Sequence, residues 1–224
     1  MDFLLPNGLA VRATRGHYVS ADGRFILTQD GKDVNLPIPR YPRPPIKNAS
    51  GPFSAENGVM DFVDFVIGSE GIYGLITACV LTLVDKPGDY LDLFFSLPDE
   101  ASAVKLHRHL LARLGSFDRL TAFEYFGVHC RQYMNNEERL FCGTNQVGIN
   151  LQIPLTGQDA GDAAEEWLTL LSEADCGVDE NAILVLDNDD TRKIFMDARH
   201  SMPANSVEVV QRRGTFTIMT DAVV

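Results

Sequence analysis

The segment from Ile67 to Thr77 (IGSEGIYGLIT) constrains the fold of this chain most, because three of its 11 residues are glycine. Glycine is favoured where the backbone takes positive φ or approaches another group closely. The apolar run from Ala78 to Val84 follows directly. We predict a tight turn whose backbone amides face a ligand, then a buried strand in which Cys79 is a small hydrophobic residue. The structural alternative is a glycine-rich turn that only connects to a core strand.

The composition excludes some classes of function. The 224 residues suffice for one large domain or two small ones. The 31 acidic and 19 basic residues give a formal charge of −12, which argues against nucleic-acid binding because phosphate contacts need clustered Lys and Arg. The four cysteines form no CxxC pair, and His107 and His109 are spaced so that they cannot share a helix face. The sequence therefore predicts no metal site.

The N-terminus bears on the location of the protein. It carries neither a basic region nor a sustained apolar run. We therefore predict no signal peptide and no transmembrane segment. A cytoplasmic location is the default expectation.

The chain is predicted to contain two domains, residues 1–88 and 89–224, because Asp85-Lys86-Pro87-Gly88 is its best boundary signal. Short β-like runs separated by Asp-Gly turns fill residues 1–36 and predict a hairpin. Five prolines between residues 37 and 45 predict an extended connection. Apolar residues at helical spacing indicate a short helix over 57–66.

The second domain is predicted to alternate strands with helices, which indicates an α+β fold. Periodicity places its strands at 90–97, 121–126, 146–155, 182–186 and 215–223, and its helices at 99–114, 128–133, 159–174 and 189–200. Gly177 is the expected C-cap of the third helix. The buried stripes expected of the two longer helices are Val104, His107, Leu110, Leu111 and Leu114, and then Ala164, Trp167, Leu168 and Leu171.

Four stretches resemble motifs of one enzyme family. The segment IGSEGIYGLIT resembles the IGSEGTLGIIT signature of the FAD-linked oxidases, which have the vanillyl-alcohol-oxidase type of flavin fold. Residues 47–51 (KNASG) resemble a conserved family turn, and 123–126 (FEYF) resemble an EFFD-like strand. Ala198-Arg199-His200 with Thr220-Asp221 resembles the RH…TD pair on the substrate side. The family includes D-lactate, glycolate and D-2-hydroxyglutarate dehydrogenases and alkylglycerone-phosphate synthase.

The resemblance implies an FAD cofactor and an architecture for both domains. Residues 1–88 would be the C-terminal part of a PCMH-type FAD-binding domain, and 89–224 a ferredoxin-like α+β cap whose antiparallel sheet is covered by helices. Residues 47–51 taken alone would more simply be a surface turn. The residues that match flavin contacts of the family are Asn48, Gly51, Gly68, Glu70, Gly71, Ile72, Tyr73, Gly74, Leu75 and Ile76.

Arg199 is the expected substrate residue, because a guanidinium binds a carboxylate bidentately and the matching arginine of the hydroxy-acid dehydrogenases has that role. The alternative is an exposed helical arginine. His200 is either a proton acceptor or a C-terminal histidine of the helix. Met219 stands where some relatives carry a lysine, and the downstream histidine cluster of the family does not occur in this chain.

The resemblance therefore predicts an FAD-dependent oxidoreductase that passes a hydride from a 2-hydroxy-acid-like substrate to the flavin, with an unidentified electron acceptor. Both ends of the chain look cut relative to the family, so we expect a fragment of a longer flavoenzyme. Two alternatives stay open. One is a non-catalytic α+β interaction module, and the other is a flavoenzyme of the alkylglycerone-phosphate-synthase type.

Overall fold

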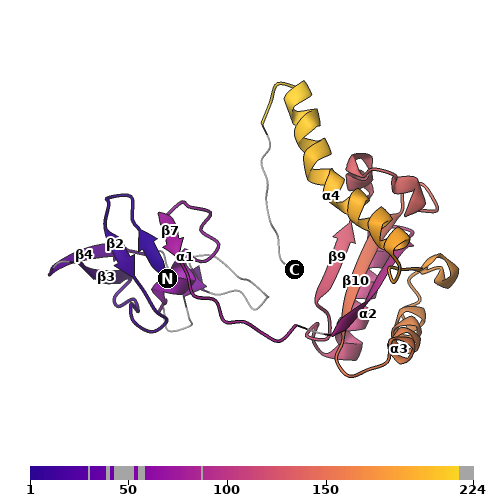
Figure 1. Cartoon of the computed structure of the whole chain (residues 1–224), viewed down its shortest axis with the longest axis horizontal. Helices are drawn as coiled ribbons and strands as arrows, with labels where there is room; N and C mark the ends of the chain where they lie inside the picture. Colours follow the sequence, from indigo (N-terminus) through magenta and orange to yellow (C-terminus); the bar gives the residue numbers. More distant parts are fainter. Residues whose placement is uncertain (30, 39–40, 43–52, 55–58, 87, 217–224) are drawn as a thin grey trace. The chain divides into compact units, whose positions relative to one another are not determined.

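The computed structural model describes residues 1–29, 31–38, 41–42, 53–54, 59–86 and 88–216. They form two compact units, Met1–Val84 and a second that extends from Asp85 to the end of the described residues. Figure 1 shows both units, with labels on many of their helices and strands. Each unit mixes helices with mainly antiparallel strands, so the predicted α+β class is confirmed. The functions expected of the two domains stay predictions.

The first unit is built on small sheets. Strand β1 (Asp2–Leu4) lies between β2 (Ala10–Arg12) and β7 (Leu75–Ala78), and both pairings are antiparallel. The predicted hairpin is confirmed by β3 (Arg24–Gln29) and β4 (Lys32–Pro37), which pair antiparallel. Strands β5 (Tyr41–Pro42) and β6 (Phe53–Ser54) pair parallel.

Aromatic rings fill the core of the first unit. Phe3 and Phe25 make edge-to-face contacts with Phe62, at centroid distances of 5.7 and 5.4 Å. Phe62 begins helix α1 (Phe62–Val66), which Asp61 caps by accepting a hydrogen bond from the Val63 amide at 2.8 Å. This cap satisfies an amide that the helix leaves unpaired, which favours a helix start directly after Asp61. The apolar face of α1 lies against the sheet. The helix is shorter than predicted, and residues 57–58 lie outside the described part.

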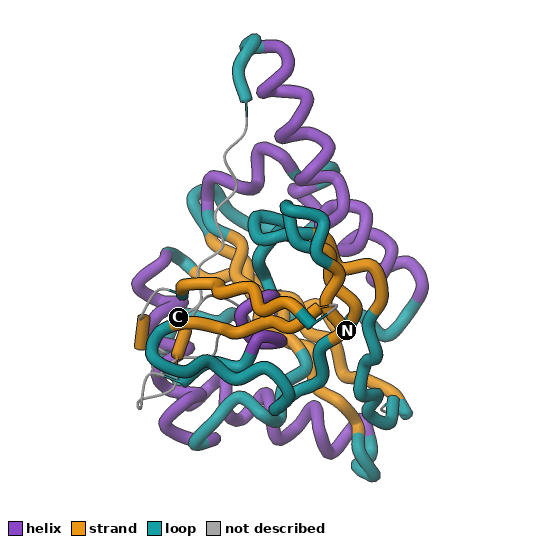
Figure 2. The backbone as a smooth tube through the Cα atoms, turned by 90° about the vertical axis from the view of Figure 1, so that its left-hand side faces the viewer, coloured by secondary structure: helices purple, strands orange, loops and turns teal. Residues whose placement is uncertain are grey.

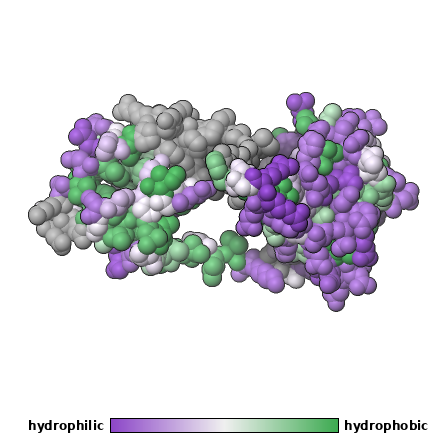
Figure 3. Space-filling view, turned by 90° about the horizontal axis from the view of Figure 1, so that it is seen from above, coloured by the Kyte–Doolittle hydropathy of each residue, from purple (hydrophilic) through white to green (hydrophobic). Residues whose placement is uncertain are grey.

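The predicted buried strand after the glycine-rich turn is wrong. Strand β7 ends at Ala78 and all four of its residues are exposed, as is Cys79. Val80 and Val84 are 93% and 88% exposed. The reason is tertiary: β7 pairs with β1 along one edge, and no described element covers its faces. Hydrophobic residues accordingly lie at the surface of this unit in Figure 3.

The second unit is organised around a four-stranded antiparallel sheet with the order β11-β8-β10-β9. Long strands β8 (Asp89–Leu97) and β10 (Val147–Leu155) form its centre, and β9 (Ala122–Phe126) and β11 (Leu184–Val185) form its edges. Because side chains alternate between the two faces, the sheet has two different surfaces. The odd-numbered residues 91–97 and 147–153 face one core, while Phe94 and Phe126 face another.

Helices α2 (Glu100–Leu114) and α3 (Ala160–Glu173) cover the first face. The expected stripes are only partly correct: α2 buries Ala103, Leu106 and Leu110, and α3 buries Ala163, Trp167, Leu170 and Leu171. Val104 and Leu111 are 49% and 41% exposed. Small alanines lie against the sheet because they allow a close approach, which a count of large apolar residues overlooks. Helix α3 is capped at Ala174, so the prediction of Gly177 was wrong.

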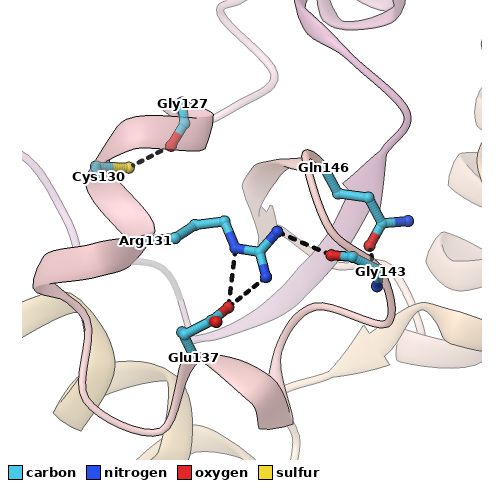
Figure 4. A network of polar contacts seen from close by, with 6 residues as sticks. All are labelled: Gly127, Cys130, Arg131, Glu137, Gly143 and Gln146. Carbon is cyan, nitrogen blue, oxygen red and sulfur yellow. Dashed lines mark hydrogen bonds and ion pairs between the residues drawn. The ribbon is translucent and has the colours of Figure 1, made fainter.

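Helix α4 (Asp189–Arg212) and the 3₁₀ turns η1 (Val128–Tyr133) and η2 (Glu137–Arg139) lie on the second face. The turns are joined through Arg131, which donates to Glu137 and to the Gly143 carbonyl (Figure 4). The Arg131 guanidinium also stacks 4.2 Å from the centre of the Phe141 ring. A short 3₁₀ helix η3 (Glu180–Ala182) precedes β11. None of the helices in the described residues is both long and apolar enough to cross a membrane.

Helix α4 is twice as long as predicted and passes through Pro203. Its buried residues are Phe195 and Ala198, and its C-terminal half extends past the sheet in Figures 1 and 2. Pro203 lacks the amide that would donate to the Arg199 carbonyl, a loss that the long helix accommodates. Of the strand expected at 215–223, residues 215–216 have no regular structure and the rest lie outside the described residues.

Candidate functional site

The glycine-rich turn of the first unit has the backbone that its sequence predicts. Gly68, Glu70, Gly71 and Gly74 all have positive φ, at 71°, 50°, 81° and 148°. A non-glycine residue with positive φ is uncommon, so the unusual conformation of Glu70 is imposed by its neighbours. The turn is therefore a run of tightly reversed backbone directly before β7.

Several amides of this turn are open. Those of Ser69, Ile72 and Gly74 donate to carbonyls within the turn and α1, at 3.1, 2.9 and 3.3 Å. Among the described residues, the amides of Glu70, Gly71 and Tyr73 have no acceptor, and the first two residues are exposed. Backbone amides grouped in this way fit an anionic group such as a phosphate.

The glycines of the turn have different roles. A Cβ on Gly74 would lie 2.3 Å from the Leu4 carbonyl and 2.7 Å from the Phe3 ring, so this glycine allows β1 to approach. A Cβ on Gly71 would meet only the Gly74 carbonyl, at 3.9 Å. Gly71 is therefore open to a ligand, whereas Gly74 serves the fold. The Tyr73 side chain belongs to the core and stacks on Phe65 at 4.3 Å.

Some predicted flavin contacts cannot be placed. Asn48 and Gly51 lie outside the described residues. Gly68 lies at the start of the turn, and the side chains of Ile72, Leu75 and Ile76 are 76%, 61% and 46% exposed. All ten residues stay predictions as cofactor contacts.

The second candidate site is a pocket of about 430 Å³ on the face of the sheet beside α4. Two adjacent rows of the sheet form its floor: Asp92 opposite Gln152, and Asn150 opposite Glu124. Arg192 and Arg199 come from α4, two helical turns apart and on the same side. The pocket therefore carries two carboxylates from the sheet and two guanidiniums from the helix.

Arg199 is bound within the protein. Its Nε and Nη2 donate to the two carboxylate oxygens of Glu124, at 2.8 and 2.5 Å. This bidentate contact, partly offset by burial, raises the pKa of the Arg199 guanidinium above its usual value. Arg199 is thus not the free, exposed helical arginine of the structural alternative. His200 is exposed, does not line the pocket, and contacts no charged group in the described part of the chain.

Asp92 carries the least well satisfied carboxylate of the pocket. Its Oδ1 is buried and has no hydrogen-bond partner among the described residues. Burial raises the pKa of the Asp92 carboxyl above 3.8, although a hydrogen bond from Gln152 and the charge of Arg192 oppose the shift. Asn150 is only 6% exposed and donates to the Leu93 carbonyl at 3.1 Å. The floor of the pocket is therefore held by internal hydrogen bonds, and the Asp92 Oδ1 is open to a further donor.

The sequence contains a signal for this pocket. Gly148, Asn150 and Gln152 alternate with the apolar residues of β10, and Glu124 and Asp92 occupy the same face of the neighbouring strands. Arg192 precedes Arg199 by seven residues, the spacing of two helical turns. Polar residues on one face of central strands thus indicated a site.

The raised pKa of Asp92 leads to a prediction about stability. A carboxyl whose pKa is higher in the folded protein binds its proton more tightly there, so its contribution to stability is lost as pH rises above about 4. We expect the unfolding free energy of Asp92→Asn, measured with urea, to increase relative to the unmodified protein as pH rises from about 4 to 7. A constant difference would contradict this. Exposed Asp187→Asn is the control and should show little change with pH.

Comparison with known proteins supports the resemblance found in the sequence. The chain is 26% identical over 144 residues to a protein named "D-2-hydroxyglutarate dehydrogenase, mitochondrial" from Rattus norvegicus, and 28% identical over 142 residues to the protein of that name from Bos taurus. Each match covers 63% of this chain but only 26% and 25% of the relative. No family model matches the chain. Since both relatives are named mitochondrial, a cytoplasmic location stays a prediction.

Proposed function

We propose that this chain is part of an FAD-dependent oxidoreductase that oxidises a 2-hydroxy acid. The observation that carries the proposal is the similarity to two D-2-hydroxyglutarate dehydrogenases together with the open amides at Glu70, Gly71 and Tyr73. Residues 1–88 supply part of the flavin-binding domain, and 89–224 supply part of the substrate domain. FAD, when bound, supplies the hydride-accepting chemistry.

The chain's own residues have two tasks in this proposal. The turn amides hold a polar group of the cofactor without any side-chain charge. The pocket beside α4 binds the substrate, and Arg199 contacts its carboxylate. The alkylglycerone-phosphate alternative is less well supported, because the two arginines of the pocket face Asp92 and Glu124 and do not form a free cationic cluster.

A second candidate function is an interaction module. The observation that favours it is the exposed apolar run from Val80 to Val84, in which Leu81 and Leu83 are 72% and 85% exposed. Flavin binding separates the two candidates, since an interaction module needs none.

FAD titration of the purified full-length protein, followed by visible absorbance, tests the proposal. We expect Gly71→Ala to weaken FAD binding about tenfold, or about 1.4 kcal/mol, because a methyl group enters the ligand side of the turn at positive φ. Gly157→Ala is the control, because Gly157 has φ +73° and open space around it but lies in the second unit. Its FAD affinity should not change.

The titration distinguishes failure of the flavoenzyme proposal from failure of the role assigned to the turn. Absence of FAD binding by the unmodified full-length protein contradicts the flavoenzyme proposal. Equal FAD affinity of the two glycine variants contradicts the use of this turn, while leaving flavin binding in place. Oxidation of D-lactate, glycolate or D-2-hydroxyglutarate with an artificial electron acceptor then identifies the substrate.

A further inference from the structure

The ion pair between Glu124 and Arg199 differs from the Arg119–Glu166 pair in the guanidinium donors that it leaves free. It joins β9 to α4 across 75 positions of sequence, and its side chains are 31% and 37% exposed. Glu124 occupies one side of the guanidinium, formed by Nε and Nη2. An arginine has five N–H donors, so three remain: both on Nη1 and one on Nη2.

Two of these donors, one on Nη1 and one on Nη2, form the terminal edge of Arg199. None of them has an acceptor among the described residues. Arg199 also lines the 430 Å³ pocket, together with Asn150 and Gln152. A terminal edge of two nitrogens matches the two oxygens of a carboxylate. The side chain is thus held by one carboxylate and has room for a second.

Arg119 and Glu166 provide an internal comparison. This pair is also bidentate, but Arg119 uses Nη1 and Nη2, at 2.8 and 2.9 Å, so its terminal edge is closed. Its exposure is similar, at 46% and 38%. Arg119 also lies against the Trp167 ring, at 5.7 Å from the ring centre. The Arg119–Glu166 pair therefore leaves no terminal edge open to a ligand, whereas the Arg199–Glu124 pair does.

Attachment of α4 to the sheet does not depend on Glu124. Phe195 and Ala198 are buried against Phe94 and Phe126, and they supply an apolar contact for the helix. A partly exposed ion pair adds little to stability beyond such a contact. What Glu124 does contribute is order, because an unpaired arginine side chain samples many rotamers.

We propose that Glu124 is a positioning residue, which holds Arg199 side-on so that its terminal edge binds the carboxylate of the substrate. The proposal rests on the proposed function for the identity of that substrate. The two carboxylates of the pocket differ, since Glu124 is bound to Arg199 whereas the Asp92 Oδ1 has no hydrogen-bond partner among the described residues. The negative charge of Glu124 lowers the attraction for any anion, so the gain comes from orientation.

Chemical modification tests this without flavin or turnover. Phenylglyoxal condenses with the two terminal nitrogens of an arginine, so it reports on the edge that the pairs leave open or close. We expect it to modify Arg199 faster than Arg119, as mapped by mass spectrometry of the intact, folded protein. Saturating D-lactate should slow the modification of Arg199 about tenfold, because the two compete for one edge.

The variants separate positioning from stability. In Glu124→Gln, which keeps the size of the side chain, D-lactate should slow the modification of Arg199 by less than about twofold, and Glu124→Asp should restore part of the protection. Glu166→Gln is the matched control and should leave the protection of Arg199 unchanged. Circular dichroism verifies that each variant is folded.

Two results overturn the proposal. One is the absence of D-lactate protection in the unmodified protein, and the other is equal or greater protection in Glu124→Gln, which would mean that Glu124 only competes with the ligand. Both are independent of FAD titration. A protein that binds no FAD but shows the expected protection keeps Glu124 as a positioning residue and loses the flavoenzyme function.

Discussion

Replacement of Trp167 by alanine is expected to lower the unfolding free energy of the second unit by about 4 kcal/mol. The Trp167 side chain is fully buried between α3 and the sheet, in the same core as Phe95 and Ile149. Its loss removes a large apolar surface and leaves a cavity that rigid β8 and β10 cannot fill. The buried indole Nε1 has no acceptor among the described residues, so the substitution breaks no hydrogen bond that would add to the cost.

Urea unfolding followed by circular dichroism measures this effect, since Trp167 is the only tryptophan and fluorescence is lost with it. Leu168→Ala is the matched control, because Leu168 is the next residue of α3 and is 36% exposed. Its cost should be below about 1 kcal/mol. Equal losses in the two variants would show that α3 is not anchored through Trp167.

Gly74→Ala is expected to destabilise the first unit by about 3 kcal/mol. The new Cβ would lie 2.3 Å from the Leu4 carbonyl, which is backbone and cannot rotate away, and φ at this position is +148°. Strand β1, the central strand of the sheet β2-β1-β7, must then separate from the edge strand β7. Strain and lost pairing therefore act together.

Hydrogen exchange of the β1 and β7 amides, with urea unfolding, measures this change. Gly8→Ala is the control, because Gly8 has φ +86° in the same unit and no atom within 4 Å of the added Cβ. We expect that variant to lose about 1 kcal/mol from backbone strain alone. Similar behaviour of the two variants would contradict the close approach of β1 to Gly74.

Local periodicity predicted most elements of the second unit because it depends on neighbours in sequence. Strands β8, β9 and β10 and helices α2 and α3 lie within a few residues of the predicted ranges. The face that a helix buries was less predictable. In α2 the expected and observed stripes share only Leu110, because the fit of Ala103 and Leu106 against the sheet depends on the partner surface.

The two candidate sites also differ in how far the sequence predicted them. Residues of the glycine-rich turn were identified from sequence because positive φ is a local property that selects glycine. The pocket was identified only in part. Arg199 was named, but Glu124 was known only as part of a strand motif, and Asp92, Asn150, Gln152 and Arg192 were not considered.

The glycine spacing of Ile67–Thr77 was sufficient to predict a reversed backbone with positive φ, since four residues there adopt it. Its motifs also pointed to the family that the D-2-hydroxyglutarate dehydrogenases represent. The sequence did not reveal that Gly74 serves the packing of β1, or that Arg199 is held by a carboxylate 75 positions away. Both depend on contacts between distant segments, which exist only after the sheets have formed.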